Sequence, residues 1–206
     1  KEYRRQRQMC IRDRYIRGDG TLADFPGSTG GGSSVSYYLN GSVSQGTFGG
    51  TTYYQMSRTP VIGVGTNFSI AANGYIASFI TDVSDPSLIS IPSGSWNIQL
   101  YMNADSAGGS PNFYVELYKY DGAVFTLLAT SSTSPESITG GASIDLYYTS
   151  ISVPTSALTV TDRLAIRVYV NNSGKTITLR TEGTNLAEVV TTFTTGLTAI
   201  NGLTAQ

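Results

Sequence analysis

The sequence predicts an all-β fold, an antiparallel β-sandwich of jelly-roll-like topology that follows a Gly-rich N-terminal linker. Short runs of residues alternate between apolar and polar side chains, and clusters of Gly, Asn, Ser and Pro separate them. No helical apolar period runs longer than two turns. The chain is also rich in Thr, Tyr, Val and Ile, which favour strands. Nine to eleven short strands with regular turns are typical of a sandwich or barrel.

The clearest strand covers residues 95–103, where every second residue is large and apolar. This period of two predicts a strand with one face buried and one face in water. The inward face is predicted to carry Trp96, Ile98, Leu100 and Met102, and the outward face Asn97, Gln99 and Tyr101.

A hairpin is predicted from residues 112–120 and 123–131, because Asp121-Gly122 separates two alternating runs. In its first strand Phe113, Val115 and Leu117 are expected to point inward, and in its second strand Phe125, Leu127 and Ala129.

Two further strands follow the same alternation, and one helical turn is expected near residues 154–158. In the first strand Ile144, Leu146 and Tyr148 are expected inward and Tyr147 outward. In the second, the inward positions are Leu164, Ile166, Val168 and Val170.

The N-terminal segment differs from the rest of the chain. Residues 1–14 hold six of the 13 basic residues and the only Cys, and they resemble a translated transposon-type sequencing adapter, expected to be disordered. Residues 15–32 are expected to form the Gly-rich linker, 33–195 the β-sandwich domain and 196–206 the start of a truncated C-terminal continuation. Residues 15–206 alone carry seven basic and twelve acidic residues, a formal charge of −5.

This composition excludes several classes of function. The chain has no His, so catalysis by an imidazole base is excluded. One Cys cannot build a disulfide framework or a Cys-based zinc site. No cofactor is expected, and neither nucleic acid nor membrane insertion is expected. Calcium stays open, with Asp82 and Asp85, or Asp105, as candidate ligands.

Several stretches resemble a tail-fibre-like structural module of bacteriophages, of the kind found in environmental viral sequence. The resemblance covers nearly all of residues 15–206 and implies a β-rich, homotrimeric virion protein without catalytic residues. It is carried by RGDGTLADF (17–25), SVSYYLNGSVSQGTFGGTTYYQMSRTPV (34–61), IPSGSWNIQLYM (91–102), FYVELYKYDGAVFTLLATSS (113–132), DRLAIRVYV (162–170), TITLRTEG (176–183) and FTTGLTAINGLTAQ (193–206).

Five tyrosines are expected on the outward faces of strands, where they would contact a protein interface or a glycan, or pack across strands. They are Tyr101, Tyr114, Tyr118, Tyr147 and Tyr169.

The functional hypothesis is a virion structural protein, a tail-fibre or appendage domain that is not an enzyme. It would attach to a host-surface glycan or protein, or assemble with other fibre segments, and it would lie in the virion. The alternative is a carbohydrate-binding β-sandwich module of a secreted bacterial protein. The third hypothesis, a polysaccharide-degrading enzyme, requires two carboxylates about 5–10 Å apart in a groove.

Overall fold

A computed structural model describes residues 14–16, 22–24 and 34–194. These residues form strands, turns and loops without any helix, which confirms the predicted all-β class. Within them, no helix is long and apolar enough to cross a membrane. The first two strands, β1 (Arg14–Ile16) and β2 (Leu22–Asp24), pair antiparallel inside the region expected to end the adapter and form the linker. The rest of the expected adapter, linker and C-terminal continuation lies outside the described residues.

Residues 34–195 form one compact unit, which is a β-sandwich. Its strands are β3 (Ser36–Phe48), β4 (Thr51–Ser57), β5 (Thr66–Ile70), β6 (Gly74–Thr81), β7 (Ser90–Ile91), β8 (Gly94–Ala104), β9 (Asn112–Tyr120), β10 (Phe125–Thr130), β11 (Glu136–Ser137), β12 (Asp145–Val153), β13 (Ser156–Ala157), β14 (Arg163–Asn171), β15 (Ile177–Thr181) and β16 (Glu188–Val190).

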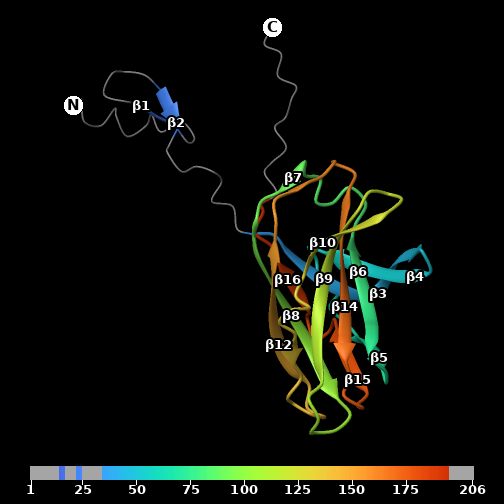
Figure 1. Cartoon of the computed structure of the whole chain (residues 1–206). Helices are drawn as coiled ribbons and strands as arrows, with labels where there is room; N and C mark the ends of the chain where they lie inside the picture. The colour runs from blue at the N-terminus through green and yellow to red at the C-terminus, as the bar shows by residue number, and fades with distance from the viewer. Residues whose placement is uncertain (1–13, 17–21, 25–33, 195–206) are drawn as a thin grey trace. The chain divides into compact units, whose positions relative to one another are not determined.

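Two layers of strands make up the sandwich (Figure 1). The layer that we call the β9 layer has the order β10-β9-β14-β6-β4, and β11 pairs with the start of β9. In the second layer, the β8 layer, β12 lies along one side of β8, β16 and β15 follow one another along its other side, and β5 pairs with β15. The long strand β3 belongs to both layers, because it pairs first with β16 and then with β4.

One pairing departs from the predicted antiparallel arrangement. β4 and β6 run parallel, and Tyr54 lies opposite Phe79. A parallel pair needs a crossover connection. Here the crossover contains β5, which leaves the β9 layer and pairs with β15 before the chain returns as β6. The sandwich is therefore mixed at this position.

The core between the layers contains most of the predicted alternating residues. In β8, β9 and β14 the apolar residues predicted to point inward are buried, and Trp96, Phe113 and Ile166 are 1% exposed or less. Burying each such side chain contributes about 1.5–3 kcal/mol. The polar residues between them face outward, so the alternation in the sequence determines which side chains reach the two outer faces.

The predicted hairpin of β9 and β10 is confirmed, and its turn has a clear chemical cause. The Asp121 carboxylate accepts the backbone N–H groups of Ala123 and Val124, at 2.9 and 2.8 Å. Gly122 has a φ of 98°, a conformation that favours glycine. The inward positions predicted for Phe125 and Leu127 are wrong, because these residues lie opposite Tyr120 and Tyr118, which face outward, and Leu127 is 49% exposed. A register shift after Leu127 then places Ala129 opposite Leu117, on the inward face as predicted.

The helical turn expected near residues 154–158 is absent from the described chain. Instead, β13 pairs antiparallel with β7, and Ser156 lies opposite Ile91. The backbone N–H of Leu158 donates to the carbonyl of Ile89 at 2.9 Å, which continues this pairing by one step.

Candidate functional site

The five tyrosines singled out in the sequence do not form one surface. Tyr114, Tyr118 and Tyr169 lie on the outer face of the β9 layer, each partly exposed. Tyr101 lies on the outer face of the β8 layer, on the opposite side of the sandwich. The fifth, Tyr147, is in the core.

The outward position predicted for Tyr147 is wrong. Tyr147 is 6% exposed, its ring packs against Phe113 at 6.2 Å, and its hydroxyl accepts the backbone N–H of Gly140 at 2.9 Å. Thr149, Ile151 and Val153 share its inward phase. In the first half of β12, large apolar residues occupy both faces, so the alternation there does not show which face is inward. Because Tyr147 points inward, its neighbour Tyr148 points outward and is 61% exposed.

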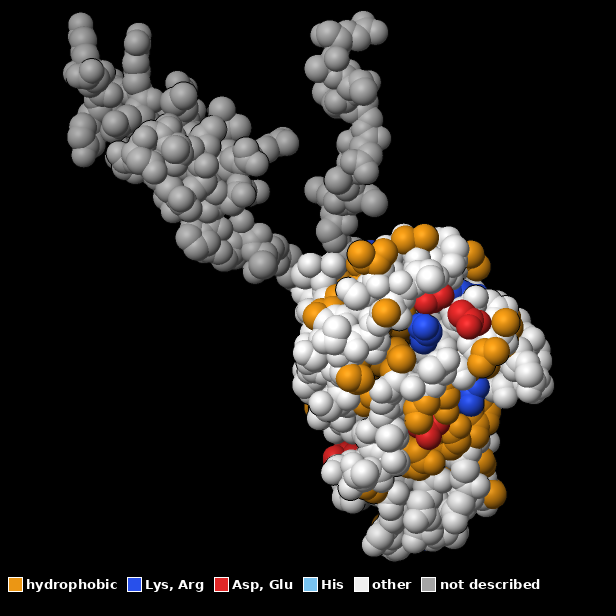
Figure 2. Space-filling view, turned by 45° about the horizontal axis from the view of Figure 1, so that its top comes forward, with side chains coloured by type: hydrophobic (Ala, Val, Ile, Leu, Met, Phe, Trp, Pro, Cys, Tyr) orange, Lys and Arg blue, Asp and Glu red, His pale blue; other side chains and the backbone are white. Residues whose placement is uncertain are grey.

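On the outer face of the β9 layer, the tyrosines contact one another. The rings of Tyr114 and Tyr169 are parallel, at 7° and with centroids 5.0 Å apart, because the two residues are direct partners on β9 and β14. Tyr75 meets the edge of Tyr169 at 6.1 Å. Figure 2 shows hydrophobic side chains gathered into a patch on this side of the molecule, with acidic atoms inside the patch.

Arg167 organises the neighbouring part of this face. Its guanidinium carbon lies 4.3 Å from the centroid of the Tyr118 ring and 5.2 Å from that of Phe125. Its Nε donates to the hydroxyl of Tyr53 at 2.7 Å. Burial opposes the charge of Arg167, but the hydrogen bond to Tyr53 and the nearby tyrosine oxygens raise its pKa above the ordinary value. We call Tyr53, Tyr118, Phe125 and Arg167 the arginine–aromatic cluster.

The tyrosines of this cluster are held in their neutral form. Burial raises the pKa of Tyr53, and the hydrogen bond from Arg167 opposes this rise. Burial also raises the pKa of Tyr118, and its hydrogen bond to the Glu116 carboxylate, at 2.5 Å, raises it further. Within the cluster Tyr53 is fully buried, and its ring stacks on that of Phe125 with the ring centroids 4.7 Å apart. The cluster is therefore a small second core on the outside of the sheet.

The outer face of the β8 layer has a different chemistry. Four residues in four neighbouring strands are direct partners in the pairing register: Tyr148 on β12, Gln99 on β8, Glu188 on β16 and Tyr38 on β3. The residues on either side of each of these four are buried in the core. Because side chains alternate between the two faces of a strand, all four project from the outer face. We call this set the Tyr148–Tyr38 row.

A second row lies beside the first, displaced by two residues along β8. Its members are Leu146, Tyr101, Arg180 and Asn67. Arg180 is held in place, since its Nε donates to the side-chain Oδ1 of Asn103 at 3.0 Å and its Nη1 to the side-chain Oδ1 of Asn67 at 3.4 Å. The face thus combines aromatic rings, amides, one carboxylate and one guanidinium.

The polar groups of the Tyr148–Tyr38 row are not used within the fold. In the described part of the chain, no side-chain hydrogen bond or ion pair involves Gln99, Glu188, Tyr38 or Tyr148. Tyr101 likewise makes no side-chain hydrogen bond there. Their donors and acceptors are open to solvent, and a ligand could use them without breaking an internal contact.

The sequence indicated only part of this face. Gln99 and Tyr101 follow from the alternation in β8, but Tyr148 was assigned to the wrong face and Tyr38 and Glu188 were not singled out. A signal for Tyr38 was present, because the buried residues Tyr37 and Leu39 flank it. The alignment of four strands into one row depends on long-range register, which a single sequence does not reveal.

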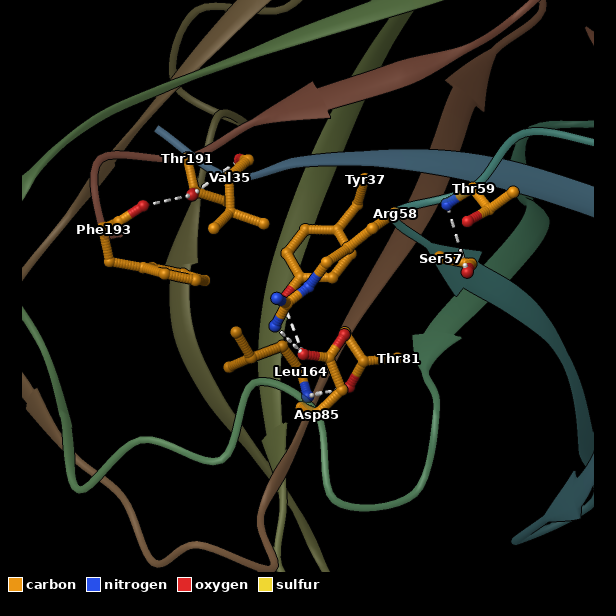
Figure 3. A network of polar contacts seen from close by, with 10 residues as sticks. All are labelled: Val35, Tyr37, Ser57, Arg58, Thr59, Thr81, Asp85, Leu164, Thr191 and Phe193. Carbon is orange, nitrogen blue, oxygen red and sulfur yellow. Dashed lines mark hydrogen bonds and ion pairs between the residues drawn. The ribbon is translucent and has the colours of Figure 1, made fainter. Parts of the chain in front are cut away.

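The carboxylates considered for calcium have protein partners. Figure 3 shows Asp85 beside Arg58, which forms an ion pair with it, and the Tyr37 hydroxyl donates to Asp85 Oδ1 at 3.2 Å. Burial, together with the charge of Asp85, raises the pKa of Tyr37. Asp82 accepts the side-chain amides of Gln45 and Gln55, at 3.0 and 2.8 Å.

The third candidate, Asp105, accepts the backbone N–H of Thr176 at 3.0 Å and the Ser106 hydroxyl at 3.0 Å. These hydrogen bonds hold its pKa below the usual value. Among the described residues, no group of three or more carboxylates converges on one point. Asp82 and Asp85 therefore act as acceptors that join a loop to strands, and Asp105 joins two loops.

Comparison with known proteins gives the fold but no family. No family model matches the chain, and no curated protein matches it. Among solved structures, an aminopeptidase from the marine sediment archaeon Thaumarchaeota archaeon matches with a TM-score of 0.52 and 8% identity, over 85% of this chain and 39% of that one. An α-amino acid ester hydrolase matches with a TM-score of 0.50 and 10% identity, over 77% of this chain and 36% of that one.

A CocE/NonD family hydrolase from Staphylococcus aureus aligns at 11% identity over 88% of this chain and 40% of that one, with a TM-score of 0.49. The chain thus spans about two fifths of the length of each of these three structures. At these identities the likeness shows the fold alone.

This finding corrects two expectations. The predicted virion structural protein is overturned, because the reported structures that share the fold belong to hydrolases. The prediction that the protein is not an enzyme is contradicted by the same matches, since the sandwich occurs as part of enzyme chains. The predicted homotrimer and the predicted locations stay predictions, because nothing in the fold bears on them.

Proposed function

We propose that the sandwich of residues 34–195 is a carbohydrate-binding module and that the outer face of the β8 layer is its binding surface. This corresponds to the alternative hypothesis from the sequence. Because the fold occurs within larger hydrolase chains, we further propose that the module accompanies a catalytic domain and brings it to a glycan.

The observation that carries the proposal is the Tyr148–Tyr38 row. A sugar ring has an apolar C–H face, which gains free energy when an aromatic ring removes it from water. It also has hydroxyl groups that both donate and accept. The Gln99 amide offers two donors and an acceptor, and the Glu188 carboxylate offers acceptors for vicinal hydroxyls. The row supplies both kinds of contact on one face.

The unused state of these groups supports the proposal. Ordering a side chain and removing its water costs free energy, so a binding surface gains most where its polar groups need not break internal bonds. The row meets this condition among the described residues, and Tyr148 is 61% exposed. The tyrosines of the β9 layer meet it poorly, because their rings and hydroxyls engage Arg167, Glu116 and one another.

A glycan array followed by calorimetry tests the proposal on the full 206-residue chain. We expect binding to at least one class of glycan. In the variant Gln99→Ala/Glu188→Ala this binding should be weakened about tenfold or more. The reason is that each lost hydrogen bond contributes about 0.5–1.5 kcal/mol, and a hydrogen bond to a charged group contributes more. The matched control is Tyr114→Ala on the β9 layer, which should bind normally.

A folded chain that binds no glycan would overturn the proposal, and so would binding lost in Tyr114→Ala and kept in Gln99→Ala/Glu188→Ala. Measuring the release of reducing ends from each bound polysaccharide would test the third hypothesis, a polysaccharide-degrading enzyme, with the same samples.

A further inference from the structure

The two tyrosines at the ends of the Tyr148–Tyr38 row are far apart. The row crosses four adjacent strands, and strands lie about 4.8 Å apart, so the backbones of Tyr148 and Tyr38 are separated by roughly 14 Å. One sugar ring is much shorter than this distance. A single monosaccharide therefore cannot contact both rings at once, whereas a chain of several sugars can.

The groups between the two rings lie along the same line. Gln99 and Glu188 occupy the two central strands of the row, so their amide and carboxylate lie between the aromatic ends. A chain laid across the strands would place its end sugars on Tyr148 and Tyr38 and its middle hydroxyls on Gln99 and Glu188. A chain laid along β8 would instead follow Asn97, Gln99 and Tyr101 toward Asn103 and would miss Tyr38.

The charge of the row limits which sugars fit. Glu188 forms no ion pair among the described residues, and the guanidinium of the adjoining row, that of Arg180, is held by Asn103 and Asn67. A uronic acid over the centre of the row would bring a second carboxylate toward Glu188. Like charges at such distances repel, so a neutral chain is favoured over an acidic one.

We infer that the ligand of this face is a neutral oligosaccharide segment lying across the strands, with one sugar on Tyr148 and another on Tyr38. This inference rests on the proposed carbohydrate-binding function and adds to it the length, direction and charge of the ligand. The site recognises a stretch of chain rather than a single sugar.

Isothermal titration of the full chain with xylose, xylobiose, xylohexaose, cellohexaose, mannohexaose and hexagalacturonate tests the inference at pH 7. We expect affinity to rise with chain length, with little binding of xylose and at least one neutral hexasaccharide bound more tightly than hexagalacturonate. Tyr148→Ala and Tyr38→Ala should each weaken hexasaccharide binding about five- to tenfold, the size of one aromatic contact. Tyr114→Ala is the matched control on the other face.

A conservative variant provides a readout that does not depend on the tyrosines. Glu188→Gln keeps the shape and an acceptor but removes the charge, so it should raise the affinity for hexagalacturonate relative to the neutral hexasaccharide. Circular dichroism checks that each variant is folded.

The outcomes separate the inference from the function on which it rests. Absence of binding to every glycan on the array overturns both. The inference is overturned if xylose binds with the same affinity as the hexasaccharide, or if Asn103→Ala weakens binding and Tyr38→Ala does not. Either result leaves the proposed carbohydrate-binding function standing. A preference for hexagalacturonate that Glu188→Gln leaves unchanged overturns the inference that the ligand is neutral.

Discussion

The two outer faces of the sandwich both carry tyrosines, yet they differ in what those tyrosines do. On the β9 layer Tyr53, Tyr118 and Tyr169 stack, donate and accept within the protein around Arg167. On the β8 layer Tyr38 and Tyr148 make no side-chain hydrogen bond with described residues. The difference teaches that exposure of an aromatic residue is a weak sign of a binding site. The sharper sign is whether its polar neighbours already have partners.

The comparison predicts that removing a side chain from the β9 face destabilises the protein. Tyr53→Ala should lower the free energy of unfolding by about 3–5 kcal/mol, the cost of deleting a fully buried aromatic ring. Urea denaturation measures this loss. Glycan affinity of the folded fraction should stay unchanged, and a loss smaller than about 1 kcal/mol would show that the cluster is not a second core.

Arg167→Ala should have a smaller effect, a loss of about 1.5–3 kcal/mol, because it removes a hydrogen bond between a charged group and the hydroxyl of buried Tyr53. Arg167→Lys keeps the charge but loses the planar stacking on Tyr118 and should recover only part of this stability. Full recovery by lysine would show that the charge alone matters and that the ring contacts do not.

Removing side chains from the β8 face should have the least effect on stability. Gln99→Ala and Glu188→Ala should each change the free energy of unfolding by no more than about 0.5 kcal/mol, as is usual for surface residues without partners. Their effect should appear in glycan affinity instead. A stability loss near 2 kcal/mol from either variant would mean that the row is structural.

The β9 face should also make stability depend on alkaline pH. The pKa of Tyr118 is raised in the folded protein, so this residue stabilises the fold fully below the pKa of an unfolded tyrosine, about 10. That contribution is lost as the pH rises above 10, since the unfolded chain ionises first. Tyr118→Phe should flatten the fall in melting temperature above pH 10, and Glu116→Gln should flatten it partly. A slope that is the same in both variants and in the unmodified chain would contradict this account.

Much of the fold could be predicted from the sequence, because it depends on local alternation. The inward faces of β8, β9 and β14 and the turn at Asp121-Gly122 follow from period and turn chemistry alone. The phase of β12 is ambiguous in its first half, since Leu146 and Tyr147 are both large and adjacent. Only Ile151 and Val153, further along the strand, mark the side of Tyr147 as inward. The parallel pairing of β4 with β6 also depends on a crossover between layers that no local pattern encodes.

The candidate site was less predictable than the fold. The tyrosine-rich composition was visible, but it did not distinguish Tyr114, which stacks on Tyr169, from Tyr148, which points into solvent. Glu188 and Tyr38 are 150 residues apart and become neighbours only through the register of β16 with β3. The proposed binding surface depends on such long-range register.

The most direct test of the account is to locate the bound glycan on one of the two faces. An NMR titration of the labelled full chain with the tightest-binding neutral hexasaccharide measures which backbone amides shift. The account predicts the largest shifts on β8, β12, β16 and the start of β3, around Gln99, Glu188, Tyr148 and Tyr38. Largest shifts on β9 and β14, around Tyr114 and Tyr169, would contradict it.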